Sequence, residues 1–273
     1  MHPAAALRFQ IEQDLQNRFP SALSPAPRTI REVAATGIAR VDSLLDGGLP
    51  VGAISELTGP QSSGRTSLAL AFVAQRTAEG KVCCWVDAQD SLDPESAAAS
   101  GVALRQLLWV RCRDNAGAAR GSAFGSASAY NRKPALQKGA RLDQALQATD
   151  LLLQAGGFAA LVLDLGGTDA ESGCRIPLAT WFRFRQAADR TRTCLLVLGE
   201  ASYAQSSAAV VLDCGALRVQ TAGNTVLSGI TYEVRRRRER FAQAGTRPGP
   251  VGVRKAPTSA WTAAGTWDTE KSA

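Results

Sequence analysis

Short apolar runs alternate along this chain with longer segments of helical periodicity, and this alternation constrains the fold more than any other feature. A fully apolar run indicates a strand buried on both faces, because a half-exposed strand would alternate apolar with polar residues. The expected strands are Ala53–Thr58, Val82–Asp87, Leu107–Cys112, Ala159–Leu165, Cys194–Leu198 and Val210–Cys214. The expected helices are Arg65–Ala78, Arg141–Ala155 and Pro177–Ala188. This pattern predicts an α/β fold, a mostly parallel twisted sheet with helices on both faces.

The segments outside this pattern suggest three parts. Residues 1–30 are expected to hold a helix, with Leu7, Ile11 and Leu15 on one stripe, and a Pro/Ser-rich linker. Residues 31–240 are the expected core, with a mobile loop at about 115–138 that is rich in Ala, Gly and Ser. The strands Leu217–Gln220 and Val226–Val234 are expected to close the core as a hairpin, and residues 241–273 to form a disordered basic tail.

One loop carries a recognisable chemical motif. Residues 59–66 match the phosphate-binding pattern GxxxxGK[ST] except at the lysine, which is Arg65, and they join an expected strand to an expected helix. Backbone N–H groups at such a helix N-terminus bind phosphate oxygens. The candidate nucleotide-binding residues are Gly59, Pro60, Gln61, Ser62, Ser63, Gly64, Arg65, Thr66 and Ser67. Asp164 closes an apolar strand, so Thr66 and Asp164 are the candidate Mg²⁺ ligands and ATP with Mg²⁺ the candidate cofactor pair.

Several runs of residues resemble the start of the bacterial RecA core. They are Thr36-Gly37, Leu45–Gly52, Gly59–Gly64, Asp87–Pro94 and the strand that ends at Asp164. The resemblance extends over roughly Ala4 to Arg240. It implies a RecA-like P-loop fold, ATP binding between subunits, a possible homo-oligomer, and action on single-stranded DNA.

The chain departs from the RecA pattern where hydrolysis needs help. Arg65 replaces the loop lysine, and Gln89 stands where the glutamate that activates water is expected. By the same alignment Ser96 replaces the tyrosine that stacks on adenine and Glu200 the glutamine that senses the γ-phosphate, whereas Asp93, the adenine contact, is kept. An amide cannot accept a proton from water, so we expect no catalytic base and little or no ATP hydrolysis.

The loops that contact DNA in RecA are short here. They correspond to Gly166–Ile176 and Gly199–Ala208, and RecA's separate C-terminal domain has no counterpart. This reduced pattern is similar to the ImuA group of RecA-like proteins, judging from the runs Leu107–Cys112, Leu142–Gly157 and Arg175–Arg185. The resemblance implies an accessory role in SOS mutagenesis and translesion synthesis in the bacterial cytoplasm, near the nucleoid, with an ImuB-like or RecA-like partner. An authentic DNA-dependent ATPase or recombinase, and an adaptor that binds no nucleotide, remain the alternatives.

Positive charge is clustered rather than spread evenly. The net charge is +7, and residues 105–143 hold eight basic against two acidic residues, while residues 233–273 hold nine against four. Clustered basic residues favour binding to an anionic polymer such as DNA. The candidate DNA or partner contacts are Arg183 and Arg185, which interleave with Trp181, Phe182 and Phe184, and the run Arg235, Arg236, Arg237 and Arg238. Packed aromatics in the first case and a solvated strand end in the second are the alternatives.

Other classes of site are disfavoured. The six cysteines form no CxxC pair and the one histidine is His2, so neither a zinc site nor Cys-His or Ser-His catalysis is expected. Most of the cysteines lie in apolar runs and are expected to be small buried side chains. The sequence also has no secretory signal and no apolar run long enough to cross a membrane.

Overall fold

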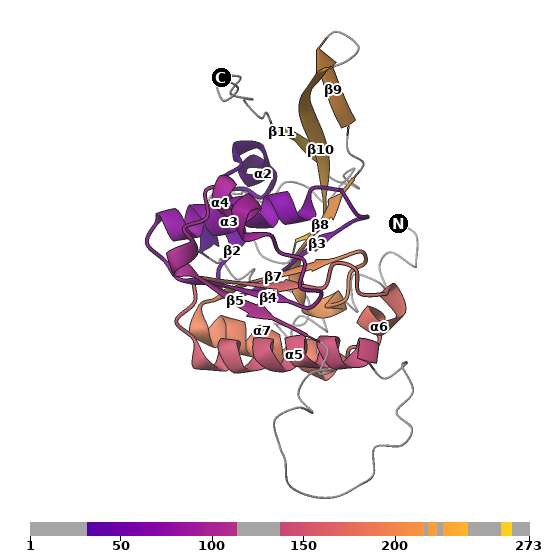
Figure 1. Cartoon of the computed structure of the whole chain (residues 1–273). Helices are drawn as coiled ribbons and strands as arrows, with labels where there is room; N and C mark the ends of the chain where they lie inside the picture. Colours follow the sequence, from indigo (N-terminus) through magenta and orange to yellow (C-terminus); the bar gives the residue numbers. More distant parts are fainter. Residues whose placement is uncertain (1–31, 114–136, 216–217, 223–225, 240–257, 264–273) are drawn as a thin grey trace, which may run out of the picture. The chain divides into compact units, whose positions relative to one another are not determined.

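A nine-stranded sheet dominates the computed structural model, which describes residues 32–113, 137–215, 218–222, 226–239 and 258–263 (Figure 1). The strand order is β11-β10-β8-β3-β7-β6-β4-β5, and β9 pairs with β10. The parallel strands are β3 (Ile54–Thr58), β4 (Cys83–Asp87), β5 (Leu107–Arg111), β6 (Ala160–Asp164), β7 (Cys194–Gly199) and β8 (Ala208–Cys214). The antiparallel strands are β9 (Arg218–Ala222), β10 (Val226–Glu239) and β11 (Thr258–Ala263).

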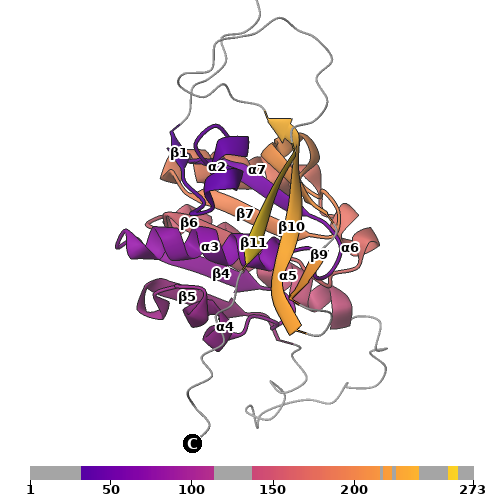
Figure 2. The ribbon, with the colours of Figure 1, turned by 90° about the horizontal axis from the view of Figure 1, so that it is seen from above.

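Helices cover both faces of the sheet (Figures 1 and 2). One face carries α2 (Ala39–Leu44), α3 (Arg65–Ala78) and α4 (Pro94–Ala99). The other carries α5 (Gln137–Ala155) and α7 (Leu178–Thr191). The remaining short elements are β1 (Val33–Ala34), β2 (Leu49–Pro50), η1 (Leu104–Gln106), α6 (Ala170–Cys174) and η4 (Gln205–Ser207). The predicted α/β architecture is therefore confirmed.

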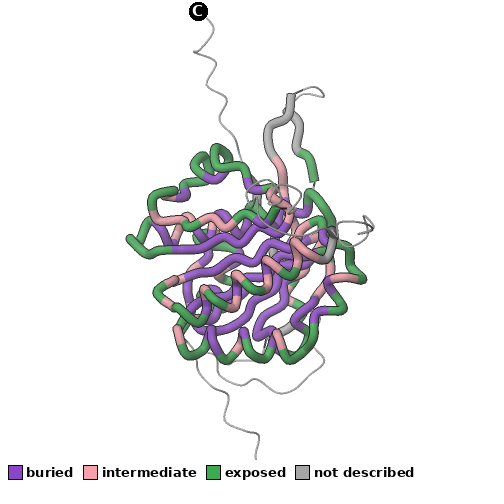
Figure 3. Tube along the Cα trace, turned by 60° about the horizontal axis from the view of Figure 1, so that its bottom comes forward, coloured by how far each residue is buried: buried purple, intermediate pink, exposed green. Residues whose placement is uncertain are grey.

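Alternate residues of each strand enter two separate cores, which explains why the strands are apolar throughout. Trp85 and Val162 face Phe72 of α3 in one core, whereas Leu163 and Val197 belong to the other core with Trp181 of α7. Figure 3 shows the consequence: the central strands are buried along their length, while the helices are exposed on their outer sides. A one-residue shift of register would exchange the two sets of side chains, so each strand is held in one register.

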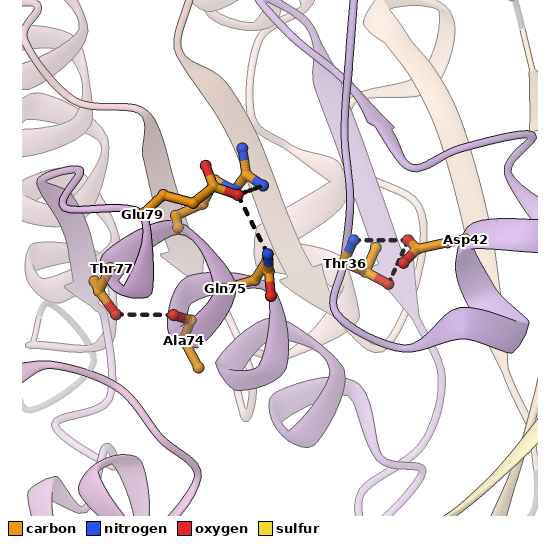
Figure 4. A network of polar contacts seen from close by, with 7 residues as sticks. Thr36, Asp42, Ala74, Gln75, Thr77 and Glu79 are labelled. Carbon is orange, nitrogen blue, oxygen red and sulfur yellow. Dashed lines mark hydrogen bonds and ion pairs between the residues drawn. The ribbon is translucent and has the colours of Figure 1, made fainter.

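The two ends of α3 are closed by local contacts. Its C-terminal turn is held by Glu79, which pairs with Arg76 and accepts a hydrogen bond from Gln75 (Figure 4). Beside it, the Asp42 carboxylate accepts hydrogen bonds from the Thr36 backbone N–H at 2.6 Å and hydroxyl at 2.7 Å, which ties β1 to α2. The N-terminal end of α3 is the loop at residues 59–64, described below.

Within the described residues, the predicted elements agree with the observed ones except at the end of the chain. β10 does not stop near Val234 but continues through the arginines to Glu239, because its backbone pairs with β8 as far as Val210. Residues 258–263, expected to be part of a disordered tail, form β11 against β10, so that expectation is wrong for this segment. A polar sequence can form a strand when a neighbouring strand supplies hydrogen-bond partners, and no apolar alternation is then needed.

Several expectations lie outside the described residues. These are the helix and linker at 1–30, most of the loop at about 115–138, and the rest of the tail at 241–273. Five of the six cysteines are buried, as expected, and burial raises the pKa of Cys83 to about 11. Within the described ranges, no helix combines the length and the apolar character that crossing a membrane requires.

Candidate nucleotide site

The loop between β3 and α3 has the backbone of a tight anion-binding turn. Gly64 lies just before α3 with φ of 83°, and Ser62 also has a positive φ of 61°. Gly59 passes so close to β8 that a Cβ atom there would lie 2.3 Å from the Cys214 carbonyl oxygen. Only glycine tolerates such an approach, and the result is a helix N-terminus that opens at the carboxyl edge of the sheet.

A cavity of about 370 Å³ lies at this edge, next to the loop. Its walls come from the loop and α3, from the segment after β4, from the segment after β6, and from the end of β7. The lining residues are Gln61, Ser62, Arg65, Thr66, Gln89, Ser91, Asp164, Gly166, Gly167 and Leu198. In parallel α/β sheets, ligands bind outside the carboxyl ends of the strands, so the position fits a binding site.

Arg65 is the most unusual group in this cavity. It is the first residue of α3 and is only 8% exposed, and its Nη1 atom is buried without a hydrogen-bond partner. A Cβ atom on Gly166 would lie 3.9 Å from Arg65 Nη2 and 2.9 Å from Asp164 Oδ1. The guanidinium of Arg65 and the carboxylate of Asp164 therefore face the same part of the cavity.

Asp164 ends β6 and is buried at the base of the cavity. Its Oδ1 accepts a hydrogen bond of 2.8 Å from the Gly166 backbone N–H. Burial raises the pKa of Asp164 to about 6, and the nearby Asp87 adds to this, while the Gly166 N–H and the Arg65 charge oppose it. Asp87 lies opposite Asp164 in the β4–β6 register, but its two oxygens accept hydrogen bonds from the backbone N–H groups of Gln89 (3.2 Å) and Leu92 (2.8 Å).

Gln89 lies two residues beyond the end of β4, at the wall of the cavity. Its side-chain amide donates a 3.4 Å hydrogen bond to the Thr168 hydroxyl, in the segment after β6. The RecA resemblance implies a glutamate here. Gln89 therefore presents an amide and not a carboxylate to the cavity, and its match to the catalytic base stays a prediction from the resemblance.

The other sequence-predicted nucleotide contacts are distributed unevenly. Gln61, Ser62, Arg65 and Thr66 line the cavity. Gly59, Pro60, Ser63, Gly64 and Ser67 lie in the same loop or helix turn without lining it, and the buried Ser63 hydroxyl has no partner. Sequence reasoning missed Ser91, Gly166, Gly167 and Leu198; the Gly-Gly pair directly after Asp164 was the available signal.

Asp93, the expected adenine contact, has a different structural role. It caps α4, with its carboxylate accepting hydrogen bonds from the Ser96 hydroxyl at 2.5 Å and from the Ser96 N–H at 3.0 Å. The Ser96 hydroxyl and N–H hold the pKa of Asp93 below its usual value. Neither Asp93 nor Ser96 nor Glu200 lines the cavity, so their nucleotide roles stay predictions.

The residues present are a poor fit for a magnesium ion. Thr66 and Asp164 both line the cavity, but a guanidinium shares the space in front of Asp164 and would repel a dication. Among the described residues, no group of three or more His, Cys, Asp or Glu side chains could hold a metal. Mg²⁺ in phosphate sites can be bound by a single carboxylate together with the phosphates, and Asp164 is the one carboxylate in this lining, so the poor fit rests on the neighbouring guanidinium.

The aromatic and basic residues of α7 separate into two sets. Trp181 and Phe184 are buried under the sheet and pack edge to face, with ring centroids 5.8 Å apart. Phe182 is 48% exposed, and the Arg185 guanidinium lies 5.2 Å from its ring centroid. Arg183 pairs with Asp150 of α5 at 3.0 Å. Two of the three aromatics are therefore core residues.

The arginines of β10 are partly paired within the molecule. Arg235 contacts Glu233 at 3.0 Å, Arg236 contacts Asp46 at 2.9 Å, and Arg237 contacts Asp213 at 2.8 Å. The side chain of Arg238 lies outside the described residues. Exposed pairs of this kind contribute only about 0–1 kcal/mol, so an arginine can exchange its carboxylate for a phosphate at small cost.

Comparison with known proteins finds relatives of one kind over the N-terminal part of the chain. Residues 8–119 match the model of the RecA N-terminal domain. Over 99 residues, 36% of this chain, it is 41% identical to Protein RecA of Crocosphaera subtropica, and over 100 residues it is 39% identical to Protein RecA of Marinobacter nauticus. These matches span only 28% and 29% of the two relatives.

A solved structure supports the fold across a larger part of the chain. The RadB recombinase superposes with a TM-score of 0.51 over 77% of this chain and 91% of its own, at 17% identity. That identity is low enough that the likeness concerns the fold alone. The chain is therefore RecA-like, in its fold and in the sequence of its N-terminal part.

Proposed function

We propose that this chain is an accessory RecA-like protein of the DNA damage response, which binds ATP weakly and hydrolyses little or none. One observation carries the proposal. Asp164 is the only carboxylate that lines the nucleotide cavity, and Gln89 presents an amide where a catalytic base is expected. A positioned general base contributes about 10²–10⁴-fold to a rate, and an amide cannot supply it.

The nucleotide-binding part rests on the loop. Its positive-φ residues, the open N-terminus of α3 and the buried guanidinium of Arg65 all favour a phosphate group. Arginine binds phosphate as a planar fork, whereas lysine acts as a point charge, so the geometry suits a bound anion more than a RecA-type turnover.

The DNA-binding part rests on the charge of β10. The side chains of Arg235 and Arg237 are 61% and 58% exposed, and their partners Glu233 and Asp213 are themselves partly exposed. We propose single-stranded DNA as the polymer, and an ImuB-like or RecA-like protein as the partner in SOS mutagenesis and translesion synthesis. The partner rests on the resemblance of Leu107–Cys112 and Arg175–Arg185 to the ImuA group.

A second candidate is a DNA-dependent ATPase of homologous recombination. Thr66 and Asp164 both line the cavity, and they are the residue types that hold Mg²⁺ in P-loop ATPases. In that case the exposed Thr66 hydroxyl and the Asp164 carboxylate would support turnover without a dedicated base.

Measurements of ATP affinity and turnover, with and without single-stranded DNA, distinguish the candidates. We expect measurable binding with turnover at least 100-fold below that of a RecA enzyme. Gln89→Glu combined with Arg65→Lys should raise turnover, and Gln89→Glu alone should raise it less. Robust DNA-stimulated hydrolysis by the unmodified chain would favour the recombinase.

The DNA contact is tested through the salt dependence of binding. Replacing Arg235 and Arg237 by Ala should weaken binding to DNA. It should also reduce the slope of log affinity against log salt by nearly two, because about two phosphate contacts are lost. The control is Arg40→Ala with Arg190→Ala, which removes the same charge from exposed positions of α2 and α7, outside the candidate DNA contacts. If both double variants have the same slope, the β10 arginines do not contact DNA.

A further inference from the structure

The buried guanidinium of Arg65 requires a partner that the protein does not supply. Its Nη1 atom is shielded from solvent and has no hydrogen-bond acceptor, although more than nine-tenths of the residue is buried and it lines the cavity. Buried charged donors are costly unless they are hydrogen-bonded to an acceptor. The same guanidinium carries Nη2, which lies near Gly166 of the cavity lining, so a ligand with negative oxygens in the cavity can pair with the charge from that side.

The surroundings identify that ligand as a phosphate group. The N-terminus of the fourteen-residue helix α3 opens beside the guanidinium, after Gly64, and its dipole favours an anion there. Ser62 and Thr66 add hydroxyl donors to the same lining. A planar guanidinium can bind two phosphate oxygens at once, which a lysine ammonium does not do in a fixed geometry.

The position of Arg65 also determines which cation can stand near the phosphates. Its Nη2 and the Oδ1 of Asp164 both lie close to Gly166 in the cavity lining. The positive charge of Arg65 offsets the single carboxylate of the lining, so the lining adds no net negative charge to that of the phosphates for attracting Mg²⁺. A guanidinium held there can neutralise a phosphate oxygen and bridge two of them, which is the electrostatic part of what a metal does.

We propose that this cavity binds the phosphates of a nucleotide without magnesium, the Arg65 guanidinium replacing both the lysine of the P-loop pattern and the metal. The inference rests on the proposed nucleotide binding and concerns how that same site works. Magnesium then competes with the protein for the nucleotide, because the ion binds the same phosphate oxygens.

The test is the affinity of the full chain for ATP, by calorimetry, in EDTA and in millimolar MgCl₂. We expect the affinity in EDTA to equal or exceed that in magnesium. Arg65→Lys should weaken binding in EDTA by at least 10-fold and make it respond to magnesium. Arg76→Lys is the matched control, because Arg76 is a similarly buried arginine at the opposite end of α3 and should leave the affinity unchanged.

Asp164→Asn should change the ATP affinity in opposite directions for binding without a metal and for binding with a metal held by Asp164. If the metal is absent, removing a negative charge beside the phosphates should keep or tighten ATP binding in both buffers. If Asp164 holds a metal, the same change should weaken binding in magnesium only.

Binding that improves 10-fold or more with magnesium would overturn the inference and leave the proposed function intact. No ATP binding in either buffer would overturn the inference and the nucleotide part of the function together, while DNA binding by the same sample would show whether the rest stands.

Discussion

Gly64 meets two structural demands at the start of α3. Its φ of 83° lies in the left-handed region, and a Cβ atom would stand 2.5 Å from the ring of Tyr232 on β10. Gly80, at the other end of the same helix, has a nearly identical φ of 77° but open space around it. Alanine variants at the two glycines therefore separate the energetic cost of the left-handed backbone from the cost of a clash with Tyr232.

Gly64→Ala should cost about 3 kcal/mol of unfolding free energy, and Gly80→Ala about 1 kcal/mol. The shared part is the left-handed backbone, and the excess is the displacement of the Tyr232 ring. Urea denaturation of the two variants measures the difference. Equal losses would mean that the Tyr232 ring moves aside freely and does not fix the loop.

Asp164 makes the stability of the chain depend on pH in an unusual direction. Its folded pKa of about 6 lies above the ordinary value of 3.8, so the folded chain binds the proton more tightly than the unfolded chain. The stability contributed by the neutral form is complete below about pH 4 and is lost as the pH rises through 6.

Asp164→Asn should therefore stabilise the ligand-free protein at pH 7.5, by up to about 3 kcal/mol, and change little at pH 4. Thermal midpoints of the variant and the wild type at the two pH values measure this. A variant that is less stable than wild type at pH 7.5 would mean that the charged carboxylate is favourably held by Arg65.

At the scale of elements, α7 shows how a helix assigns different roles to adjacent aromatics. In the sequence alone, the consecutive residues 181–184 (Trp-Phe-Arg-Phe) resemble a surface on which nucleic-acid bases could stack. The helical period turns Trp181 and Phe184 towards the sheet and Phe182 towards solvent. Only one of the three rings remains for a ligand.

Trp181→Ala should cost about 3–5 kcal/mol of stability, because it empties a fully buried site. Phe182→Ala, one residue away and half exposed, should cost less than about 1 kcal/mol. Chemical denaturation of both variants tests the assignment. Similar losses at the two positions would mean that α7 is rotated relative to the sheet from the orientation described.

At the scale of the whole molecule, the apolar stripe of the N-terminal segment bears on assembly. Leu7, Ile11 and Leu15 form an apolar stripe on a helix expected to be marginal by itself, because isolated helices of about 12–15 residues or fewer are barely stable in water. We therefore predict that the stripe buries against another protein molecule.

Deleting residues 1–20 should abolish association, with a second copy or a partner, and leave the thermal midpoint of the core within about 2 °C. Light scattering and a melting curve on the same sample measure both. A lowered midpoint with association retained would assign the segment to its own core.

The sequence by itself determined the features that depend on neighbouring residues. These local features are the strand and helix periods, the glycines of the loop at 59–64, and the replacements at Arg65 and Gln89. The observed β3, α3, β6 and β7 lie where the pattern predicts them. Periodicity indicates burial directly, because apolar residues that recur every two positions in a strand, or about every 3.6 positions in a helix, lie on one face of that element. The extension of β10 and the strand β11 escaped this reasoning because a polar strand is held by its partner strand and not by its own pattern.

Only the tertiary structure decided what the functional side chains face. Arg65 and Asp164 are 99 residues apart in the sequence, yet both line the same cavity and both lie close to Gly166. Arg236 meets Asp46 across 190 residues, and Asp93 caps α4 instead of lining the nucleotide cavity. The sequence gives the charge of each side chain. Which group that charge interacts with is decided by how the chain packs, because electrostatic interactions depend on distance in space and on burial.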